Sequence, residues 1–217
     1  MDARMTGDGE TTRRAEKRDA VLDAAKRVLA RDGVDGFSVA RIAREAGVAK
    51  ATFFYYFADK RALIAALAVQ HFEAEVDNVT RALEQVTDAN RLPGAMFEAR
   101  VRYNAERLDA FRLAFLWPTV FGVPDTWMRD VLYPLNNRLF GALAARLSAA
   151  KARGEVREDI EPRVAVNLAM TQAQGVIDML SSVDRMGGTT TLSVDTLVVG
   201  IRAMIDRAMG VAGTPGR

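Results

Sequence analysis

Apolar residues recur at three- and four-residue spacing along almost the whole chain, which is the periodicity of an amphipathic α-helix. The first such stripe, over 21–29, predicts a helix that ends near Asp32-Gly33. Two shorter helices are predicted over about 39–46 and 50–56, and a long one reaches about Leu83. No segment alternates apolar and polar residues for long enough to predict a strand.

Beyond residue 85 the same periodicity predicts five more helices, so the chain is expected to have about nine. Their approximate ranges are 93–108, 110–117, 125–153, 162–183 and 192–209. Pro134 falls inside the third of these and predicts a kink or a delayed start, because proline lacks the backbone N–H that a helix interior needs. We therefore predict an all-α fold.

Composition excludes several classes of protein. Of the 217 residues, 49% are apolar and 27% charged, which is typical of a globular chain. The chain has no cysteine, so disulfides, thiolate metal sites and cysteine nucleophiles are excluded, as expected of a cytoplasmic protein. No apolar run approaches the roughly 18 residues that cross a bilayer, and the first twenty residues contain no signal-like apolar stretch.

The titratable residues indicate no active site. His71 is the only histidine, which leaves little material for general acid–base chemistry. His71 and Glu75 are four residues apart, but two ligands without a third make a weak metal site, and a helix-surface pair is the simpler interpretation. Glu98 and Arg102 have the spacing of a helix salt bridge. We expect no enzymatic activity, no cofactor and no metal.

The basic surplus lies in the N-terminal quarter. The net charge is +2 overall; 1–60 contains 12 Lys and Arg against 10 Asp and Glu, while the charges of 61–217 balance. The surplus falls in two basic runs, residues 13–31 and residues 37–61. This distribution is expected of a small module that faces a polyanion, although a solvated helix face explains either basic run alone equally well.

The stretch SVARIAREAGVAKATFFYYF has the pattern of a helix, a glycine turn and a second helix. Gly47 permits the sharp turn, and Phe53 and Phe57, four residues apart, share the face that anchors the second helix. Four consecutive aromatic residues cannot all face inward, so one or two are expected near solvent or a partner. The side chains left outward at the helix start can enter a DNA major groove; they are Lys50, Ala51, Thr52 and Phe54, with Tyr55 and Tyr56 nearby.

Residues 17–64 resemble the N-terminal domain of the TetR family of bacterial transcriptional regulators almost position by position. The resemblance implies an all-α homodimer with a three-helix helix-turn-helix module, a connecting fourth helix and a C-terminal domain that dimerises and encloses a small-molecule effector. The expected domains are a disordered tail over 1–12, the DNA-binding domain over 13–60 and the effector-binding and dimerisation domain over 61–213.

The resemblance also implies roles for individual residues. Thr52 stands where the family commonly has a DNA-contacting threonine, Tyr56 at a contact position, and Lys60 where a lysine binds backbone phosphate. Phe54 departs from the family's usual tyrosine and lacks the hydroxyl that would bond a phosphate or a base; packing on a thymine methyl is a substitute. The complete set of DNA-binding residues we expect is Ser38, Arg44, Lys50, Ala51, Thr52, Phe54, Tyr55, Tyr56 and Lys60.

The C-terminal part allows less specific predictions. The helix over 162–183 has apolar residues on two sides, and the helix over 192–209 has one apolar stripe. This pattern favours a four-helix dimer interface over completion of a monomeric core. The interface residues we expect are Ala173, Gly175, Ile177, Leu197, Ile201, Met204 and Ile205. Aromatic and polar residues that could line an effector pocket are Phe97, Tyr103, Phe115, Trp117, Phe121, Trp127, Gln174 and Asp178.

These observations predict a ligand-responsive repressor that a small, mostly apolar or aromatic effector releases from a palindromic operator. The alternative is a helical architectural DNA-binding protein without an effector, although the 130 residues beyond the DNA module exceed what dimerisation needs. A small-molecule carrier comes third and leaves the N-terminal motif unexplained.

Overall fold

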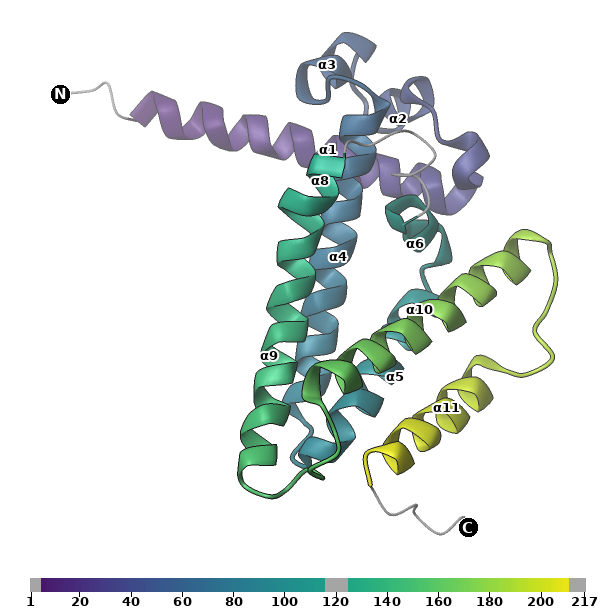
Figure 1. Cartoon of the computed structure of the whole chain (residues 1–217). Helices are drawn as coiled ribbons and strands as arrows, with labels where there is room; N and C mark the ends of the chain where they lie inside the picture. The colour runs from purple at the N-terminus through teal and green to yellow at the C-terminus, as the bar shows by residue number, and fades with distance from the viewer. Residues whose placement is uncertain (1–4, 116–124, 211–217) are drawn as a thin grey trace. The chain divides into compact units, whose positions relative to one another are not determined.

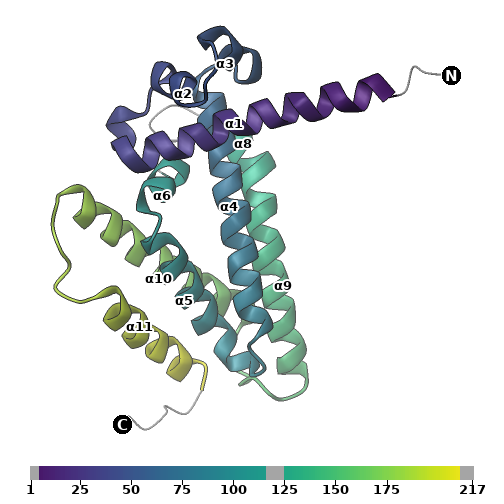
Figure 2. The same cartoon turned by 180° about the vertical axis from the view of Figure 1, so that it is seen from behind.

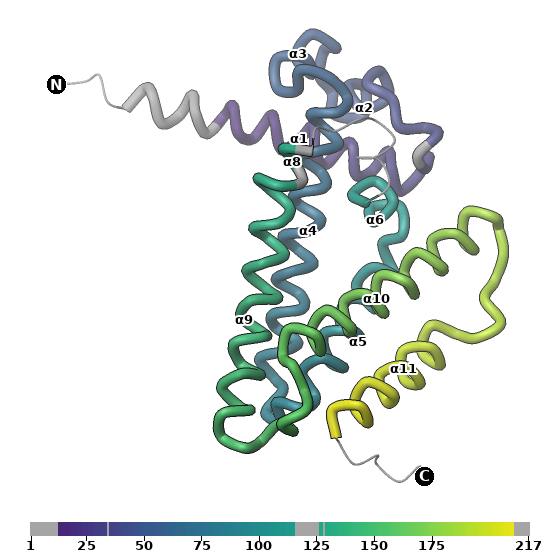
Figure 3. The backbone as a smooth tube through the Cα atoms, in the orientation of Figure 1, coloured from purple at the N-terminus to yellow at the C-terminus, as the bar shows by residue number. Residues whose placement is uncertain are grey.

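The computed structural model describes the backbone of residues 5–115 and 125–210, and the side chains of 13–33, 35–115, 126–127 and 129–210 (Figure 3). Within these residues the chain is helical and has no strand, and nine α-helices are seven residues or longer, which confirms the predicted all-α fold. These helices are α1 (Met5–Gly36), α2 (Val39–Glu45), α3 (Lys50–Tyr56), α4 (Lys60–Glu84), α5 (Leu92–Ala105), α6 (Leu108–Phe115), α9 (Tyr133–Ala152), α10 (Pro162–Arg185) and α11 (Val194–Ala208).

The chain packs as two compact units. The first comprises residues 1–70 and 109–123, and therefore α1 to α3, the first part of α4, and α6. The second comprises 71–108 and 124–217, and therefore the rest of α4, α5 and α8 to α11. The division falls inside α4, whereas the sequence placed the domain boundary at residue 60.

The core of the first unit lies between α1, α2, α3 and the start of α4 (Figures 1 and 2). The apolar stripe of α1 is buried in it, with Val21 and Val28 fully inaccessible. Leu113 of α6 completes the cluster. The other large side chains that close it are Phe37, Ile42, Phe53, Phe57, Leu63, Ile64 and Leu67.

The second unit is built around α5. α10 packs against α5 and α9, and α11 packs against α5 (Figure 1). Arg146 of α9 donates hydrogen bonds to the carbonyl oxygens of Leu83 and Val86, both at 3.1 Å, which ties α9 to the end of α4. None of the helices that the structure describes is both long enough and apolar enough to cross a bilayer.

Local capping signals set most helix boundaries where the sequence predicted them. Ser38 caps α2 by accepting a hydrogen bond from the backbone N–H of Arg41. The Asp59 carboxylate accepts one from the N–H of Ala62 at 2.8 Å and so begins α4. Pro162 occupies the first turn of α10, where its missing N–H costs nothing.

The predicted helix over 125–153 is interrupted at its start. A short helical turn, α8 (Asp125–Trp127), leads into a π-helical segment, η2 (Met128–Leu132), and α9 begins only at Tyr133. Pro134 lies in the first turn of α9. The delayed start predicted from Pro134 is therefore confirmed, since proline is accepted in a first helical turn but not further inside.

α1 begins earlier than the sequence predicted. Residues 5–12, which the sequence assigned to an irregular tail, are part of the helix; residues 1–4 lie outside the described chain. Once the packed turns of a helix have formed, each further residue adds a hydrogen bond at little cost, so a helix can extend past its apolar stripe. At its other end α1 is broken at Gly33, whose φ is 63°, as the Asp32-Gly33 pair predicted.

The turn between α2 and α3 depends on Gly47. Its φ is 67°, in the left-handed region that residues with a Cβ resist. The N–H of Gly47 donates to the Arg44 carbonyl at 3.1 Å, and the N–H of Val48 donates to the Ala43 carbonyl at 3.0 Å. These bonds close the end of α2 and turn the chain into α3.

We predict that Gly47→Ala lowers the free energy of unfolding by about 1 kcal/mol, because a Cβ at this φ strains the backbone. No atom lies within 4 Å of the added Cβ, so backbone strain alone accounts for the loss. Gly141→Ala is the control, since Gly141 lies inside α9 with equally open space. There the same change should stabilise by up to about 1 kcal/mol. Thermal unfolding measures both; a Gly47 variant as stable as the parent chain would contradict the strained turn.

Candidate functional site

Two aromatic rings fix the orientation of α3. Phe53 is fully buried and Phe57, at the end of the helix, is 3% exposed. Their ring centroids are 5.8 Å apart, so both rings enter the same core from one side of the helix. Because α3 has only seven residues, this anchored side determines which side chains face outward.

The outward side of α3 carries the side chains that the sequence selected. Tyr55 is 62% exposed and Phe54 is 46% exposed. Lys50 and Ala51 are also exposed, whereas Thr52 is half-buried. The expectation that one or two of the four consecutive aromatic residues would remain near solvent is therefore confirmed.

The remaining residues of the expected DNA-binding set come from α2 and its cap, the end of α3 and the start of α4. Ser38 and Arg44 are exposed, and Tyr56 is half-buried against the core of the first unit. The Lys60 ammonium lies 5.5 Å from the centroid of the Phe37 ring, and its partial burial lowers the pKa of Lys60 below the ordinary lysine value. All of these residues belong to the first unit.

Position 54 shows what replaces the family's usual tyrosine. The Phe54 ring packs edge-on against Phe53, with centroids 5.4 Å apart and planes at 85°. Such edge-to-face contact stabilises the ring where it is, and the exposed remainder offers an apolar surface without a hydroxyl.

Several arginines of the basic N-terminal quarter are paired with carboxylates. Glu45 accepts hydrogen bonds from Arg27 and Arg31, both at 2.9 Å. Asp32 accepts from Arg31 at 2.9 Å and from Arg41 at 3.3 Å. The bonds from Arg31 are the main cause of the lowered pKa of both carboxyl groups. These arginines brace α2 against α1, so they contribute less to the basic surface than the sequence count suggested.

The residues expected to line an effector pocket are dispersed. Phe97 is fully buried, Phe115 and Trp127 are half-buried, and Trp117 and Phe121 lie outside the described residues. Gln174 and Asp178 bond to each other along α10, 3.2 Å apart. Of the six that the structure describes, Tyr103 alone lines one of three cavities formed by described residues.

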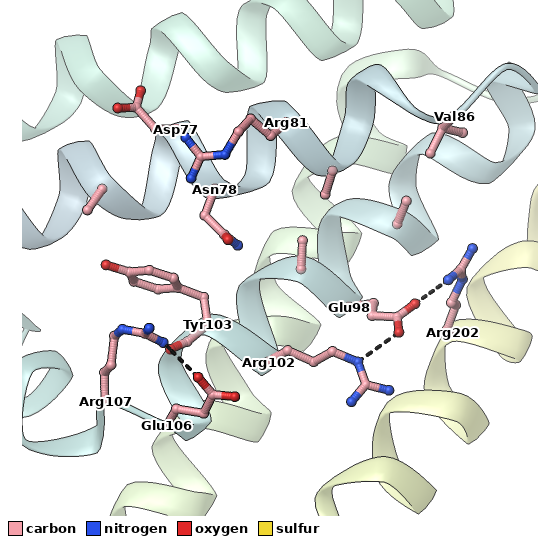
Figure 4. Close-up of a pocket in the computed structure, with 14 residues that line it drawn as sticks. Asp77, Asn78, Arg81, Val86, Glu98, Arg102, Tyr103, Glu106, Arg107 and Arg202 are labelled. Carbon is pink, nitrogen blue, oxygen red and sulfur yellow. Dashed lines mark hydrogen bonds and ion pairs between the residues drawn. The ribbon is translucent and has the colours of Figure 1, made fainter.

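The cavity at Tyr103 is the largest of the three, with a volume of about 780 Å³. It lies within the second unit, between α4, α5 and α11, and is lined mainly by polar side chains (Figure 4). Asp77, Asn78 and Arg81 come from α4; Glu98, Arg102 and Tyr103 come from α5; Glu106 and Arg107 follow α5; and Arg202 comes from α11.

Ion pairs connect the walls of this cavity. Arg102 donates to Glu98 at 2.8 Å, which confirms the predicted helix salt bridge, and Arg202 of α11 also donates to Glu98 (Figure 4). Burial alone would raise the pKa of Glu98, but the bonds from the two arginines outweigh it and the pKa is lowered. The sequence did not reveal this cluster, because its members are brought together from different helices.

A buried polar network lies next to the cavity. His71 Nε2 donates to Asn104 Oδ1 at 3.0 Å, and Asn104 Nδ2 donates to Glu75 Oε1 at 2.9 Å. Arg100 Nε donates to the same Glu75 oxygen at 2.7 Å. The His71 ring is 5.5 Å from the ring of Tyr103, so the network extends to the cavity wall. His71 and Glu75 are thus buried partners of Asn104, not the helix-surface pair expected from their spacing.

No group of three or more His, Cys, Asp or Glu side chains that could hold a metal occurs among the described residues. The arrangement that stands out chemically is therefore the exposed side of α3, held by its buried rings next to α2. Two helices joined by a tight turn, with the second presenting polar and aromatic side chains, define a helix-turn-helix DNA-binding protein.

Comparison with known proteins agrees with this class. Residues 21–67 match the family model of bacterial regulatory proteins, tetR family. An uncharacterized HTH-type transcriptional regulator of Mycobacterium bovis is 27% identical over 184 residues, which cover 84% of this chain and 91% of the relative. Tetracycline repressor protein class D of Escherichia coli is 38% identical over 53 residues, 24% of each chain.

Solved structures of TetR-family regulators share this fold. The TetR family transcriptional regulator PfmR from Thermus thermophilus superposes with a TM-score of 0.65 over 86% of this chain and 97% of that one, at 18% identity. The chain is a TetR-family helix-turn-helix transcriptional regulator, a member of a non-enzymatic family of DNA-binding proteins.

We predict that His71 makes stability depend on pH. Burial lowers the pKa of His71, and Arg107 and Arg100 act in the same direction against Glu75 and Asn104. The unfolded chain therefore binds a proton more readily than the folded chain below about pH 6.5. Consequently the free energy of unfolding falls as the pH drops from about 7.5 to about 5.5, by at most about 1.4 kcal/mol per pH unit.

Urea unfolding at several pH values within this range measures the effect. His71 is the only histidine, so His71→Gln should be nearly independent of pH there, whatever its absolute stability. The same slope in the parent chain and in the variant would contradict the assignment.

Proposed function

We propose that this regulator is a cytoplasmic homodimeric repressor that binds a palindromic operator and leaves it when a small molecule occupies its second unit. The observation that carries the proposal is the exposed side of α3, which Phe53 and Phe57 hold outward. An α-helix of this size fits a major groove about 12 Å wide, and two copies related by a twofold axis would read two half-sites.

The chemistry of the exposed side supports distinct roles for its residues. The Thr52 hydroxyl can bond a base edge or a phosphate oxygen, and Tyr55 and Tyr56 carry further hydroxyls. Lys50, Arg44 and Lys60 supply positive charge for the phosphate backbone. We assign Ala51 and Phe54 to close packing on the groove, where a small or apolar side chain can contact a thymine methyl.

Exposed apolar residues on α10 and α11 support the homodimer. Val164, Leu168 and Met179 are 63%, 43% and 40% exposed and share one side of α10 with Gly175. On α11, Met204 is 59% exposed and continues the stripe of Leu197 and Ile201. A second copy would bury these side chains.

Three of the other expected interface residues are buried within the protomer. Ala173 and Ile177 are fully buried within the chain, and Ile205 is 5% exposed. They pack inside the protomer and have almost no exposed surface that a partner could contact. We therefore propose that the exposed residues of the same helices make the dimer contacts.

The polar cavity supports effector binding, with a change in the expected chemistry. Four arginines and three carboxylates line it, together with the Tyr103 ring. Polar groups facing a concave site fix the orientation of a ligand by hydrogen bonds. A polar effector fits this cavity better than the mostly apolar one expected from the aromatic residues of the sequence.

We predict different effects for two substitutions in the DNA-binding set. Thr52→Ala should weaken binding to the operator by about 1–2 kcal/mol, the value of a typical hydrogen bond, and leave a mixed-sequence duplex unaffected. Lys60→Ala should weaken both duplexes to a similar extent, because a phosphate contact does not discriminate between sequences. The operator is first selected from a random duplex library with the full chain, and fluorescence anisotropy gives the affinities.

Failure to select any duplex would overturn the proposal that this chain recognises an operator. Unchanged operator affinity in Thr52→Ala would remove Thr52 from the contacts. A change of sequence preference in Lys60→Ala would show that Lys60 contacts bases.

We predict that Leu168→Glu dissociates the dimer, because a buried and unpaired carboxylate in an apolar interface is strongly unfavourable. Sedimentation equilibrium at micromolar concentration should give twice the 23.8 kDa chain mass for the parent and the single mass for the variant. Ala145→Glu, on the exposed side of α9, is the control and should remain dimeric. A monomeric parent chain, or a dimeric Leu168 variant, would contradict the interface.

A further inference from the structure

The N-terminal part of α1 is helical without burying an apolar face. All eight residues of 13–20 are exposed, and the buried stripe of the helix begins only at Val21. Four of the eight are basic: Arg13, Arg14, Lys17 and Arg18. No buried apolar contact accounts for this segment, so we ask what its basic side chains bind.

Two of these arginines continue the buried stripe. One side of α1 carries residues spaced three or four apart: Arg14, Arg18, Val21, Ala25 and Val28. The side of the helix that is apolar in the core of the first unit is therefore basic beyond it. That side faces α3, since both arginines lie against aromatic rings at α3.

The guanidinium of Arg14 lies 4.9 Å from the centroid of the Tyr55 ring, and that of Arg18 lies 5.2 Å from the centroid of the Phe57 ring. Tyr55 belongs to the exposed side of α3, and Phe57 is the residue that ends the helix. A guanidinium stacked on a ring keeps its N–H edge available, and this edge suits phosphate oxygens. Figures 1 and 2 both show α1 running past α3.

The described residues place little negative charge beside these arginines. Among the described residues no carboxylate forms an ion pair with Arg14, and Arg18 has only the exposed Asp19 at 3.9 Å. By contrast, Arg27 and Arg31 further along α1 are bonded to Glu45. The two parts of the helix therefore differ: Arg27 and Arg31 are bonded to Glu45 of α2, whereas Arg14 and Arg18 have no carboxylate within hydrogen-bonding distance among the described residues.

We propose that Arg14 and Arg18, with Lys17 beside them, form a second DNA contact that binds backbone phosphates flanking the bases read by α3. The proposal rests on the proposed operator binding and adds to it a surface outside the helix-turn-helix. Its partner is duplex DNA beyond the end of each half-site. The contact contributes affinity and fixes α3 in its groove, but it reads no bases.

The test uses two duplexes, both built from an operator selected with the full chain. One is trimmed to the selected motif, and the other carries about ten further base pairs, one helical turn, on each side. The variant Arg14→Gln with Arg18→Gln removes two charges and keeps polar side chains that favour a helix. The control, Lys26→Gln with Arg138→Gln, removes two charges from exposed positions elsewhere on α1 and on α9.

The parent chain should bind the long duplex more tightly than the trimmed one. The arginine variant should lose about tenfold or more on the long duplex and little on the trimmed one, and the control should match the parent on both. On the long duplex the slope of log affinity against log salt should fall by about 0.9 for each phosphate that is no longer neutralised, hence by about 2 per protomer. Arg14→Lys with Arg18→Lys should restore most of the slope.

Three results would overturn the proposal. The first is an arginine variant that behaves like the control on the long duplex. The second is an equal loss on both duplexes, which would mean that the arginines act by holding α3. The third is a loss that the lysine variant fails to restore, which would make the contribution one of packing. Any of these leaves operator binding intact, provided that Thr52→Ala still weakens the trimmed duplex, so the two proposals fail separately.

Discussion

The structure depends on the burial of Phe53 and Phe57 beneath α3. A helix of seven residues is too short to be stable by its own hydrogen bonds, so tertiary packing must hold it. The two rings supply that packing, and the turn at Gly47 orients α3 so that both rings enter the core. The outward side of α3 is thereby fixed without any contribution from its exposed residues, which we propose to contact DNA.

Charged side chains have opposite roles in different parts of the molecule. Around Glu45 and Asp32 they are paired and brace one helix against another, whereas Arg14 and Arg18 rest on aromatic rings and keep their charge. In the second unit the Glu98 carboxylate, shared between Arg102 and Arg202, joins α5 to α11 beside the cavity. A ligand that competes for those arginines would disturb one of the two helices on which we place the dimer contacts.

Local signals explain why so much of the fold could be predicted from the sequence. Caps and breakers such as Ser38, Gly47 and Pro162 act within one turn, and the two aromatic anchors are four residues apart. The cavity could not be predicted in the same way, because Arg81, Arg102 and Arg202 line it together only after three helices far apart in the sequence have packed. The aromatic residues chosen for it instead reflect a general preference of ligand sites; of those described, Phe97 belongs to the buried core and only Tyr103 lines the cavity. The sequence also could not show which arginines form ion pairs, because some of their carboxylate partners lie on neighbouring helices.

The most direct test of the central claim places a single thiol on the outward side of α3. The chain has no cysteine, so Ala51→Cys provides a unique probe, and Ala145→Cys on α9 provides its control. The rate of maleimide labelling is measured with and without saturating operator duplex. The account predicts fast labelling of both free proteins, with DNA slowing only the position on α3. A thiol at position 51 that reacts slowly in the free protein, or equally fast in the complex, would contradict it.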